Sequence, residues 1–163
     1  MGTNHSYQVS LDWTGNTGAG TRDRRSYRRT HDVTAEGKPV IAGSSDPAFR
    51  GDRDRWNPEE LLVVSLAQCH MLWYLDLAAR HGVTVTGYQD DATGSMVEHP
   101  DGSGNFTEVV LRLRVTIAAG ADADLAQRLH DGVDELCFIA RSVNFPVRHE
   151  PSVRVGPLPT RAA

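Results

Sequence analysis

The longest hydrophobic pattern in the chain covers residues 56–82 and predicts a helix with clear signals at both ends. Asn57 can cap the helix, Pro58 suits its first position, and Glu60 follows Asn57 by three as in a capping box. Arg80 places a cation in the last turn, and Gly82 can take the left-handed conformation that ends a helix. About two dozen residues lie between these signals, which gives a helix of roughly 36 Å.

This predicted helix is apolar nearly all round, so it is either the buried axis of a domain or a membrane span. Charged residues lie near both ends, and the longest uncharged run, residues 61–75, is shorter than the ~20 residues that a span needs. We therefore predict a buried axis, with Cys69 near its middle. The apolar residues Met71, Leu72 and Trp73 that follow Cys69 are expected to be core residues.

The N-terminal part predicts a strand hairpin. Residues 7–13 alternate, with Tyr7, Val9, Leu11 and Trp13 on one face, which is typical of a half-buried strand. The glycine-bearing loop at residues 15–20 lacks the Lys-Ser/Thr of a phosphate-binding loop and has no helix pattern after it, so it predicts a hairpin connection.

A second strand is predicted over residues 27–33. The alternation of its side chains raises the question of whether Arg29 points into the core. Tyr27, Arg29, His31 and Val33 share one face of this strand. If that face points inward, Arg29 needs a partner, because burying an unpaired charge is costly. Alternatively, the strand is an edge and Arg29 reaches solvent. The residues alone leave both possibilities open.

The rest of the chain predicts two further strands, a turn and a second helix. Residues 37–39 read as a turn and residues 43–55 as an irregular loop before the long helix. Residues 83–96 are extended, residues 99–104 turn, and residues 106–117 alternate as one long strand, which together predict an antiparallel hairpin.

The second helix is expected to begin near residue 122 or 124, and a final short strand covers residues 152–155. Leu125, Leu129, Val133 and Leu136/Cys137 fall on one stripe, while Gly132 weakens the middle of this helix. The order of elements predicts an α+β fold with antiparallel sheet, and the length favours a single domain over residues 1–163.

Composition narrows the partners and the compartment. The net charge is −4 with both signs scattered, so we expect no nucleic-acid partner and no membrane partner. The first residues lack a charged-then-apolar signal pattern, which predicts a cytoplasmic protein. In that reducing compartment the two cysteines, Cys69 and Cys137, are expected to be thiols.

Cys69 and Cys137 lie on the inward faces of two predicted helices, which leaves three interpretations. The first is packing, because free cysteine is often buried. The second is a metal site with His70 and His130, which the lack of C-x-x-C spacing and the divergent directions of the adjacent Cys69 and His70 disfavour. The third is a redox pair, in which one thiolate attacks an oxidant and the other thiol resolves it.

A redox pair needs a thiolate, and Cys69 lies too far from the helix start for the helix dipole to lower its pKa. A nearby cation would serve instead, and Arg29 is the natural candidate. A buried arginine in turn requires a carboxylate to orient it, and an acidic residue at a helix start would fit.

Three segments carry a resemblance to a known family. They are N-P-E-E-L-L-V-V-S-L-A-Q-C-H-M-L-W-Y-L around Cys69, R-R-T-H upstream and E-L-C-F-I-A-R-S-V-N-F-P-V downstream. Together they resemble the OsmC/Ohr family of organic hydroperoxide reductases, in its OsmC-like branch, over essentially the whole chain. The resemblance implies an α+β fold in which antiparallel sheets wrap long central helices in an intertwined homodimer.

The resemblance also implies roles for four residues. Cys69 corresponds to the peroxidatic cysteine, Cys137 to the resolving cysteine, Arg29 to the arginine that activates the thiolate, and Glu59 to the glutamate that pairs with it. The chain departs from the family where many members have His-x-x-Cys-Pro, because here the segment reads Asp134-Glu-Leu-Cys137-Phe138.

The function that follows is the reduction of organic (alkyl or lipid) hydroperoxides through a Cys69 sulfenic acid and a Cys69–Cys137 disulfide. The resemblance implies no bound cofactor or metal and an external dithiol reductant, including lipoyl-bearing proteins. His31 and His70 are candidates for proton transfer, although packed or solvated histidines are the simpler interpretation. The alternative function is a non-catalytic dimeric scaffold, related to stress, whose thiols are merely buried.

Helix geometry supports the homodimer independently. Glu59 and Cys69 lie about 15 Å apart along one straight helix, so they cannot share a site within it. Two copies that cross near Val64 about a two-fold axis would bring Glu59 of one subunit toward Cys69 of the other. A shared site therefore predicts an obligate dimer.

Overall fold

A computed structural model describes residues 2–156, which fall into two compact units, Met1–Leu61 and Leu62–Ala163. The division between them falls in the first turn of the long helix α1 (Pro58–Arg80). Residues 1 and 157–163 of the predicted single domain lie outside the described part, and the assignment of one domain to the whole chain stays a prediction.

The first unit is built on a three-stranded antiparallel sheet. Its strands are β1 (Ser10–Trp13), β2 (His31–Thr34) and β3 (Ile41–Gly43), in that order, and a short 3₁₀ turn at Pro47–Phe49 follows. In β1 and β2, Trp13 pairs with His31 and Ser10 with Thr34. The predicted hairpin between the first two strands is therefore confirmed, although its connection is long.

Strand β2 begins four residues later than predicted, so the strand phase that grouped Tyr27 and Arg29 with His31 is wrong. Tyr27 makes only an isolated bridge to Asn16. The indole nitrogen of Trp13 donates to the carbonyl oxygen of Arg28 at 2.9 Å. That carbonyl is therefore engaged by a side chain, and the regular ladder between the two strands starts only at His31.

The predicted burial of β1 is also wrong for the single chain. Tyr7 is 91% exposed and Leu11 66%, and the two hydrophobic cores of the described residues contain no residue of this strand. Three strands of three or four residues are too small to bury a face by themselves. The alternating pattern therefore offers an apolar face to solvent.

Helix α1 confirms the predicted start and end signals. The Asn57 side chain accepts a hydrogen bond from the Glu60 N–H at 2.7 Å, and the Glu60 carboxylate accepts one from the Asn57 N–H at 3.3 Å. This pair of bonds is the capping box. After Arg80, Gly82 takes the left-handed conformation with φ of 74°.

The prediction of α1 as a fully buried axis is wrong for one chain, because only one stripe is buried. That stripe comprises Leu66, His70, Tyr74 and Ala78 at i, i+4 spacing. Leu72 is 60% exposed. By length and apolar composition α1 also qualifies as a membrane span, a test that core helices pass as well. Its buried stripe lies in the cores of the second unit.

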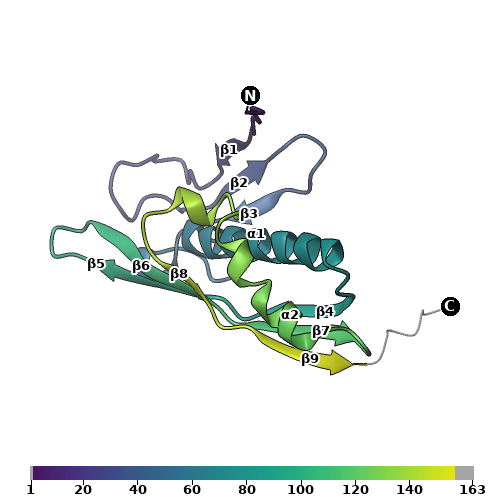
Figure 1. Ribbon diagram of the computed structural model, residues 1–163. Helices are drawn as coiled ribbons and strands as arrows, with labels where there is room; N and C mark the ends of the chain where they lie inside the picture. The colour runs from purple at the N-terminus through teal and green to yellow at the C-terminus, as the bar shows by residue number, and fades with distance from the viewer. Residues whose placement is uncertain (1, 157–163) are drawn as a thin grey trace. The chain divides into compact units, whose positions relative to one another are not determined.

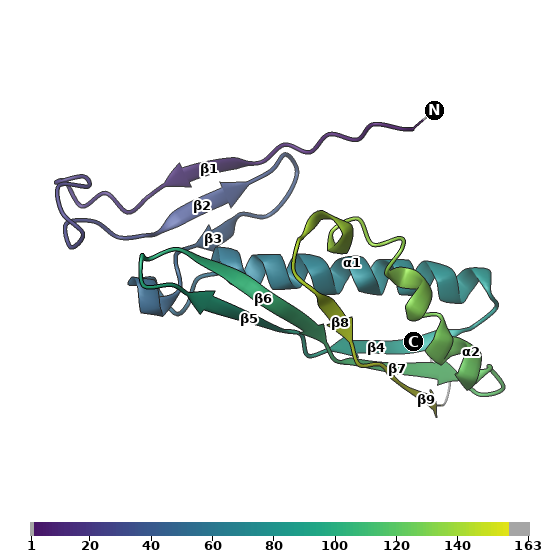
Figure 2. The ribbon, with the colours of Figure 1, turned by 60° about the vertical axis from the view of Figure 1, so that its left-hand side comes forward.

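The second unit holds two three-stranded sheets, shown in Figures 1 and 2. One has the order β4-β7-β9 and the other β5-β6-β8. Their strands are β4 (Val85–Asp90), β5 (Thr93–Glu98), β6 (Gly104–Leu111), β7 (Leu113–Ala118), β8 (Val147–His149) and β9 (Ser152–Gly156). The predicted α+β class is confirmed. The pairs β4–β7 and β5–β6 are antiparallel, whereas β6–β8 and β7–β9 are parallel, which the sequence did not predict.

The long strand predicted at residues 106–117 is two strands separated at Arg112. The Asp90 carboxylate accepts the Arg112 N–H at 2.9 Å, so a side chain replaces a ladder bond where β6 ends and β7 begins. The chain therefore changes sheet at this point, while the alternation of inward residues continues through it.

The predicted second helix is shorter and is followed by single turns. Helix α2 covers Ala123–Arg128, and 3₁₀ turns follow at Asp131–Val133 and Ala140–Ser142. The break falls next to Gly132, the residue that weakened this helix in the sequence. The predicted stripe holds nevertheless, since Leu129, Val133 and Cys137 are buried.

The main core of this unit lies between its helices and the β4-β7-β9 sheet. Figures 1 and 2 show α1 and α2 on the same side of that sheet. Tyr74 from α1, Ile117 from β7 and Ala126 from α2 meet there, and the Tyr74 hydroxyl donates to the Ala126 carbonyl oxygen at 3.2 Å. Cys137 belongs to this core and Cys69 packs against it.

Candidate redox site

The second unit brings Cys69 and Cys137 together, although 68 positions separate them in the sequence. Cys69 comes from the middle of α1, and Cys137 from the turns that follow α2. Cys69 packs against the core that contains Cys137, its sulfur is close enough to influence the pKa of Cys137, and both residues are free thiols. Neighbouring thiols of this kind are candidates for a disulfide.

The two thiols have different surroundings. Cys137 is 2% exposed, and its sulfur accepts the backbone N–H of Ala140 at 3.4 Å. Burial, and in second place the neighbouring sulfur of Cys69, raises the pKa of Cys137 to about 11. Cys137 therefore keeps its proton at neutral pH, while Cys69 is only half-buried. The Cys137 thiol is therefore shielded from solvent, and the Cys69 thiol is the more accessible of the two.

Aromatic side chains lie next to the thiol pair. Trp73, one turn after Cys69, meets Phe138 edge to face with ring centroids 5.6 Å apart. Phe138 is 66% exposed, and Leu72 is also largely exposed. The expectation that Leu72 is a core residue is therefore wrong for the single chain. These side chains give the thiols an apolar and partly open approach.

Arg29 belongs to the first unit, where its guanidinium is held by neighbouring groups. It donates to the carbonyl oxygens of Tyr27 at 2.9 Å and Arg24 at 3.0 Å, and it lies over the Tyr27 ring at 4.4 Å. The Arg29 side chain is half-buried. This is intermediate between the two possibilities left open by the sequence, an arginine that points inward and an arginine that reaches solvent. The placement of Arg29 beside Cys69 stays a prediction.

Glu59 lies in the first turn of α1, and one of its carboxylate oxygens accepts no hydrogen bond from the described residues. Its Oε2 is buried and has no hydrogen-bond partner within residues 2–156. The ion pairs of this part of the chain do not include an Arg29–Glu59 pair. A buried carboxylate oxygen without a donor favours a cationic or hydrogen-bonding partner.

A cluster of histidines on α1 and its neighbours was not predicted as a unit. The Nε2 of His70 lies 3.0 Å from the Nδ1 of His130, and the two rings stack. The His149 ring is 5.4 Å from that of His70. Burial, together with the smaller effect of the neighbouring histidines, lowers the pKa of His70 to about 4 and that of His130 to about 3.

These histidines change the earlier expectations for proton transfer. His70 is buried, it lies next to His130, and its pKa is well below neutrality. It is therefore a packed histidine, which is the simpler of the two interpretations of the sequence. His31 lies in the first unit and contacts the Arg29 carbonyl oxygen at 3.0 Å. Among the described residues, the group of ligand atoms that lie close together does not contain Cys69, His130 or Cys137, so the four-ligand metal set considered from the sequence does not form.

Comparisons with known proteins place the chain in a family. The sequence profile described as OsmC-like protein matches residues 51–152, which is more than half of the chain. The chain belongs to the OsmC-like family. The resemblance seen in the sequence is thereby confirmed.

Individual relatives agree with this assignment. The chain is similar to an OsmC-like protein of unknown function from Vibrio cholerae, at 28% identity and a TM-score of 0.83, with 91% of this chain and 100% of that chain covered. It is also similar to the uncharacterised Bacillus subtilis protein YmaD, at 24% identity over 93% of this chain and 97% of that protein.

The organic hydroperoxide resistance protein OhrB of Bacillus subtilis shares the fold, with a TM-score of 0.56, 17% identity, and coverage of 91% of this chain and 98% of that chain. At this level of identity the similarity shows the fold.

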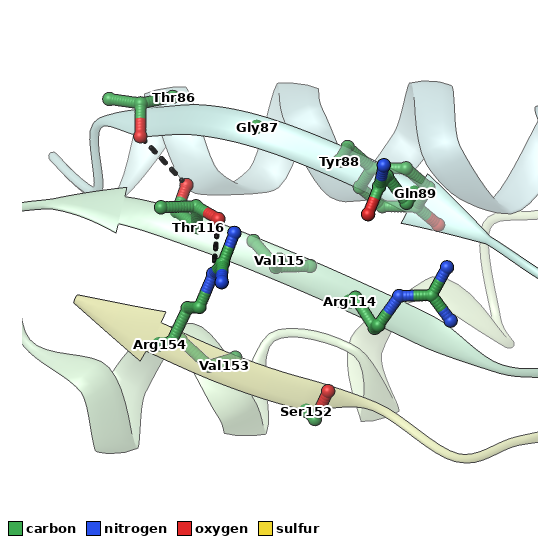
Figure 3. A pocket seen from close by; sticks show the side chains of 10 residues that line it. All are labelled: Thr86, Gly87, Tyr88, Gln89, Arg114, Val115, Thr116, Ser152, Val153 and Arg154. Atoms are coloured by element: carbon green, nitrogen blue, oxygen red, sulfur yellow. Dashed lines mark hydrogen bonds between the residues drawn. The ribbon is translucent and has the colours of Figure 1, made fainter. Parts of the chain in front are cut away.

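A hollow lies on the outer side of the β4-β7-β9 sheet (Figure 3). Its volume is about 670 Å³, and its lining contains no thiol or histidine. Its polar side chains bond along the sheet, since Arg154 donates to the Thr116 hydroxyl at 3.0 Å and Thr86 donates to the Thr116 carbonyl oxygen. Arg114 pairs with Asp91. Because the lining has hydroxyl groups but no cysteine or histidine to react or to act as a base, we place the candidate chemistry at the thiols.

Proposed function

We propose that this OsmC-like protein is a thiol-dependent peroxidase that reduces organic hydroperoxides to alcohols. The observation that carries the proposal is the contact between the Cys69 and Cys137 thiols in the folded unit. Membership of a family with organic hydroperoxide resistance proteins supports the choice of oxidant.

In the first step the Cys69 thiolate attacks the distal oxygen of the hydroperoxide. The O–O bond breaks, Cys69 becomes a sulfenic acid, and the leaving alkoxide takes a proton to become the alcohol. The partly open position of Cys69 and the adjacent Trp73 and Phe138 side chains favour an apolar substrate. Cys137 remains a protonated thiol during this step, because its pKa is raised.

In the second step Cys137 sulfur attacks the Cys69 sulfenic acid sulfur. A Cys69–Cys137 disulfide forms, and the hydroxyl group leaves as water with the Cys137 proton. An external dithiol, such as a dihydrolipoyl group, then reduces the disulfide by exchange and is itself oxidised to a disulfide. The protein needs no bound cofactor in this cycle.

Arg29 and Glu59 are the proposed positioning and activating groups. A guanidinium near Cys69 would stabilise the thiolate and the developing alkoxide. The unsatisfied Oε2 of Glu59 is suited to orient that guanidinium by a charge-assisted hydrogen bond. This arrangement requires Arg29 to leave its contacts with Tyr27 and Arg24 or to extend beyond them.

We infer further that the working molecule is a homodimer. A single chain leaves apolar side chains exposed on β1 and on α1, among them Leu11 and Leu72. Apolar surface of this kind is stabilised when a second copy covers it. Glu59 and Cys69 lie ten positions apart on the same helix, and a second copy would bring Glu59 of one subunit toward Cys69 of the other.

The deciding experiment is a thiol titration of the reduced protein. One equivalent of cumene hydroperoxide should consume both thiols, release one equivalent of cumyl alcohol, and give a Cys69–Cys137 disulfide in the mass-spectrometric peptide map. Cys69→Ser should abolish turnover. Cys137→Ser should consume one peroxide only and leave a Cys69 sulfenic acid that a dimedone probe traps.

Two results would refute the peroxidase. Folded wild-type protein that keeps two free thiols after the peroxide is added would favour the non-catalytic scaffold instead. A Cys69→Ser variant that still turns over peroxide would place the chemistry elsewhere. Circular dichroism of each variant is the control that loss of reactivity does not follow from unfolding.

A further inference from the structure

Beside the thiol pair, the second unit assembles a separate group of ligand atoms. His70 on α1, Asp134 after the Asp131–Val133 turn and His149 on β8 each offer one atom, and these atoms lie within 4.8 Å of one another. The residues come from three segments that are distant in the sequence. Cys69 and Cys137, next to His70 and near Asp134 in the sequence, are not members of this group.

Outer contacts orient both histidines of the group. His70 uses its Nε2 toward His130 Nδ1 at 3.0 Å, which leaves its Nδ1 as the ring nitrogen without a hydrogen bond in the described part of the chain. His149 uses its Nε2 toward the Asp131 carboxylate at 3.4 Å, and its Nδ1 lies 3.5 Å from the Asp134 carboxylate. Histidine ligands in metal sites are held in this way by a second polar group on the other ring nitrogen.

We propose that His70, Asp134 and His149 bind a divalent transition-metal ion of the zinc type, with His130 and Asp131 as outer partners. Two histidine nitrogens and one carboxylate oxygen form a ligand set typical of sites that keep a further position for water. The 3.5 Å between His149 and Asp134 is close to the about 3.3 Å edge of a tetrahedron with metal–ligand distances of about 2.0 Å.

Burial and charge favour a cation at this place. His70 is buried and His149 half-buried, whereas the Asp134 side chain is 56% exposed, so an ion has an approach from solvent. The carboxylates of Asp131 and Asp134 both face His149, at 3.4 Å and 3.5 Å from its two ring nitrogens. A bound cation would lie among these carboxylates and reduce the repulsion between their charges.

Binding would fasten the segment that carries Cys137 to the helix that carries Cys69. Asp134 lies one turn before Cys137, and His70 follows Cys69 directly. The ion would therefore link α1, the turns after α2 and β8 through one group of ligands. This site departs from the expectation that the protein binds no metal, and it does not depend on the peroxidase proposal.

The test uses Co²⁺ and Zn²⁺ on the full reduced chain, freed of any affinity tag. One Co²⁺ per chain should bind and give visible ligand-field bands without the near-ultraviolet charge-transfer band of thiolate ligation, and Zn²⁺ should displace it. Asp134→Asn and His149→Gln should each abolish stoichiometric binding. Asp131→Asn should weaken binding about 10- to 100-fold, as expected for an outer partner.

Controls separate this site from the thiols and from the remaining histidines. A Cys69→Ser, Cys137→Ser double variant should bind Co²⁺ as the wild type does, and so should His99→Gln, which changes a histidine in the β5–β6 turn. Failure of the folded wild type to bind one ion would overturn the proposal. Binding that survives Asp134→Asn and His149→Gln, or that disappears with the cysteines, would overturn it as well.

Discussion

At the scale of single residues, the proposed chemistry depends on the difference between two neighbouring sulfurs. Cys137 is buried and its thiol keeps its proton, while Cys69 is half-buried and closer to solvent. Attack on a peroxide requires a thiolate, and resolution requires a second sulfur within reach. The fold supplies the neighbouring sulfur, and Arg29 is the group proposed to stabilise the thiolate of Cys69.

The raised pKa of Cys137 predicts how fast it is alkylated at different pH. Because the thiolate is the reactive form, alkylation should rise about tenfold per pH unit and level off only near pH 11. Cys69→Ala removes the neighbouring sulfur, which is the second cause of the raised pKa, so Cys137 should react faster at a given pH. Iodoacetamide labelling followed by peptide mapping measures both rates.

The unfolded chain supplies the control for this labelling, since both cysteines should then react as ordinary thiols. Labelling of Cys137 in folded protein at pH 7 as fast as in unfolded protein would show that the thiol is not protected.

A second prediction at this scale concerns the two adjacent arginines. Arg29→Ala should slow the reaction of Cys69 with cumene hydroperoxide about 100-fold, because it removes the group proposed to stabilise thiolate and alkoxide. Arg29→Lys should restore part of the rate through its charge. Arg28→Ala should leave the rate unchanged. Stopped-flow tryptophan fluorescence with each variant gives the rates.

If Arg28→Ala slows the reaction and Arg29→Ala does not, then Arg28 is the arginine that activates Cys69, and the role proposed for Arg29 is wrong. If neither slows it, the thiolate has another source of stabilisation. Circular dichroism controls for the loss of the contacts that Arg29 makes with Tyr27 and Arg24.

At the scale of elements, α1 positions the site because it starts and ends at fixed residues. The capping box at Asn57 and Glu60 sets where the helix begins, and Gly82 sets where it ends. The i, i+4 stripe from Leu66 to Ala78 then fixes which side of α1 faces the core. The rotation of Cys69 about the helix axis follows from that packing.

Removal of the cap should destabilise the protein without changing the thiols. Asn57→Ala deletes the acceptor for the Glu60 N–H and should lower the free energy of unfolding by about 1 kcal/mol. Glu60→Gln keeps a side-chain acceptor for the Asn57 N–H and should cost less. Urea denaturation followed by circular dichroism compares the two variants, and equal losses would contradict this role of Asn57.

At the scale of the whole molecule, the exposed apolar surface of one chain points to a second copy. Sheet β1-β2-β3 and the outward side of α1 leave apolar side chains in solvent, and neither belongs to the buried part of the two cores. The alternating pattern of β1 and the all-round apolar pattern of α1 are explained if both become buried on assembly.

A charge on the outward side of α1 should separate the proposed dimer. Leu72→Lys places an ammonium group where a partner helix is expected, and burial of an unpaired charge is costly. We expect a monomer and a loss of peroxide turnover, whereas Leu72→Met, which keeps the volume apolar, should remain dimeric and active. Light scattering after size-exclusion chromatography measures the mass.

A wild-type protein that is monomeric and active in the same measurement would refute the dimer. A Leu72→Lys variant that stays dimeric would instead place the interface on another surface of the chain.

The sequence by itself determined the elements whose signals are local. The ends of α1 follow from Asn57, Glu60 and Gly82, and the turn at residues 99–104 and the strand of residues 152–155 follow from local patterns, because these signals act over a few residues. The motif around Cys69, together with the segments quoted upstream and downstream of it, indicated the family, which the comparisons confirmed.

Tertiary structure alone decided which residues meet. At the break near Arg112 the Asp90 carboxylate accepts the Arg112 N–H, and before β2 the Trp13 indole donates to the Arg28 carbonyl oxygen, both from distant positions in the sequence. The contact of Cys137 with Cys69 and the grouping of His149 with His70 likewise arise when separate segments pack on α1. Local patterns contain no information on such pairs, because long-range packing chooses them.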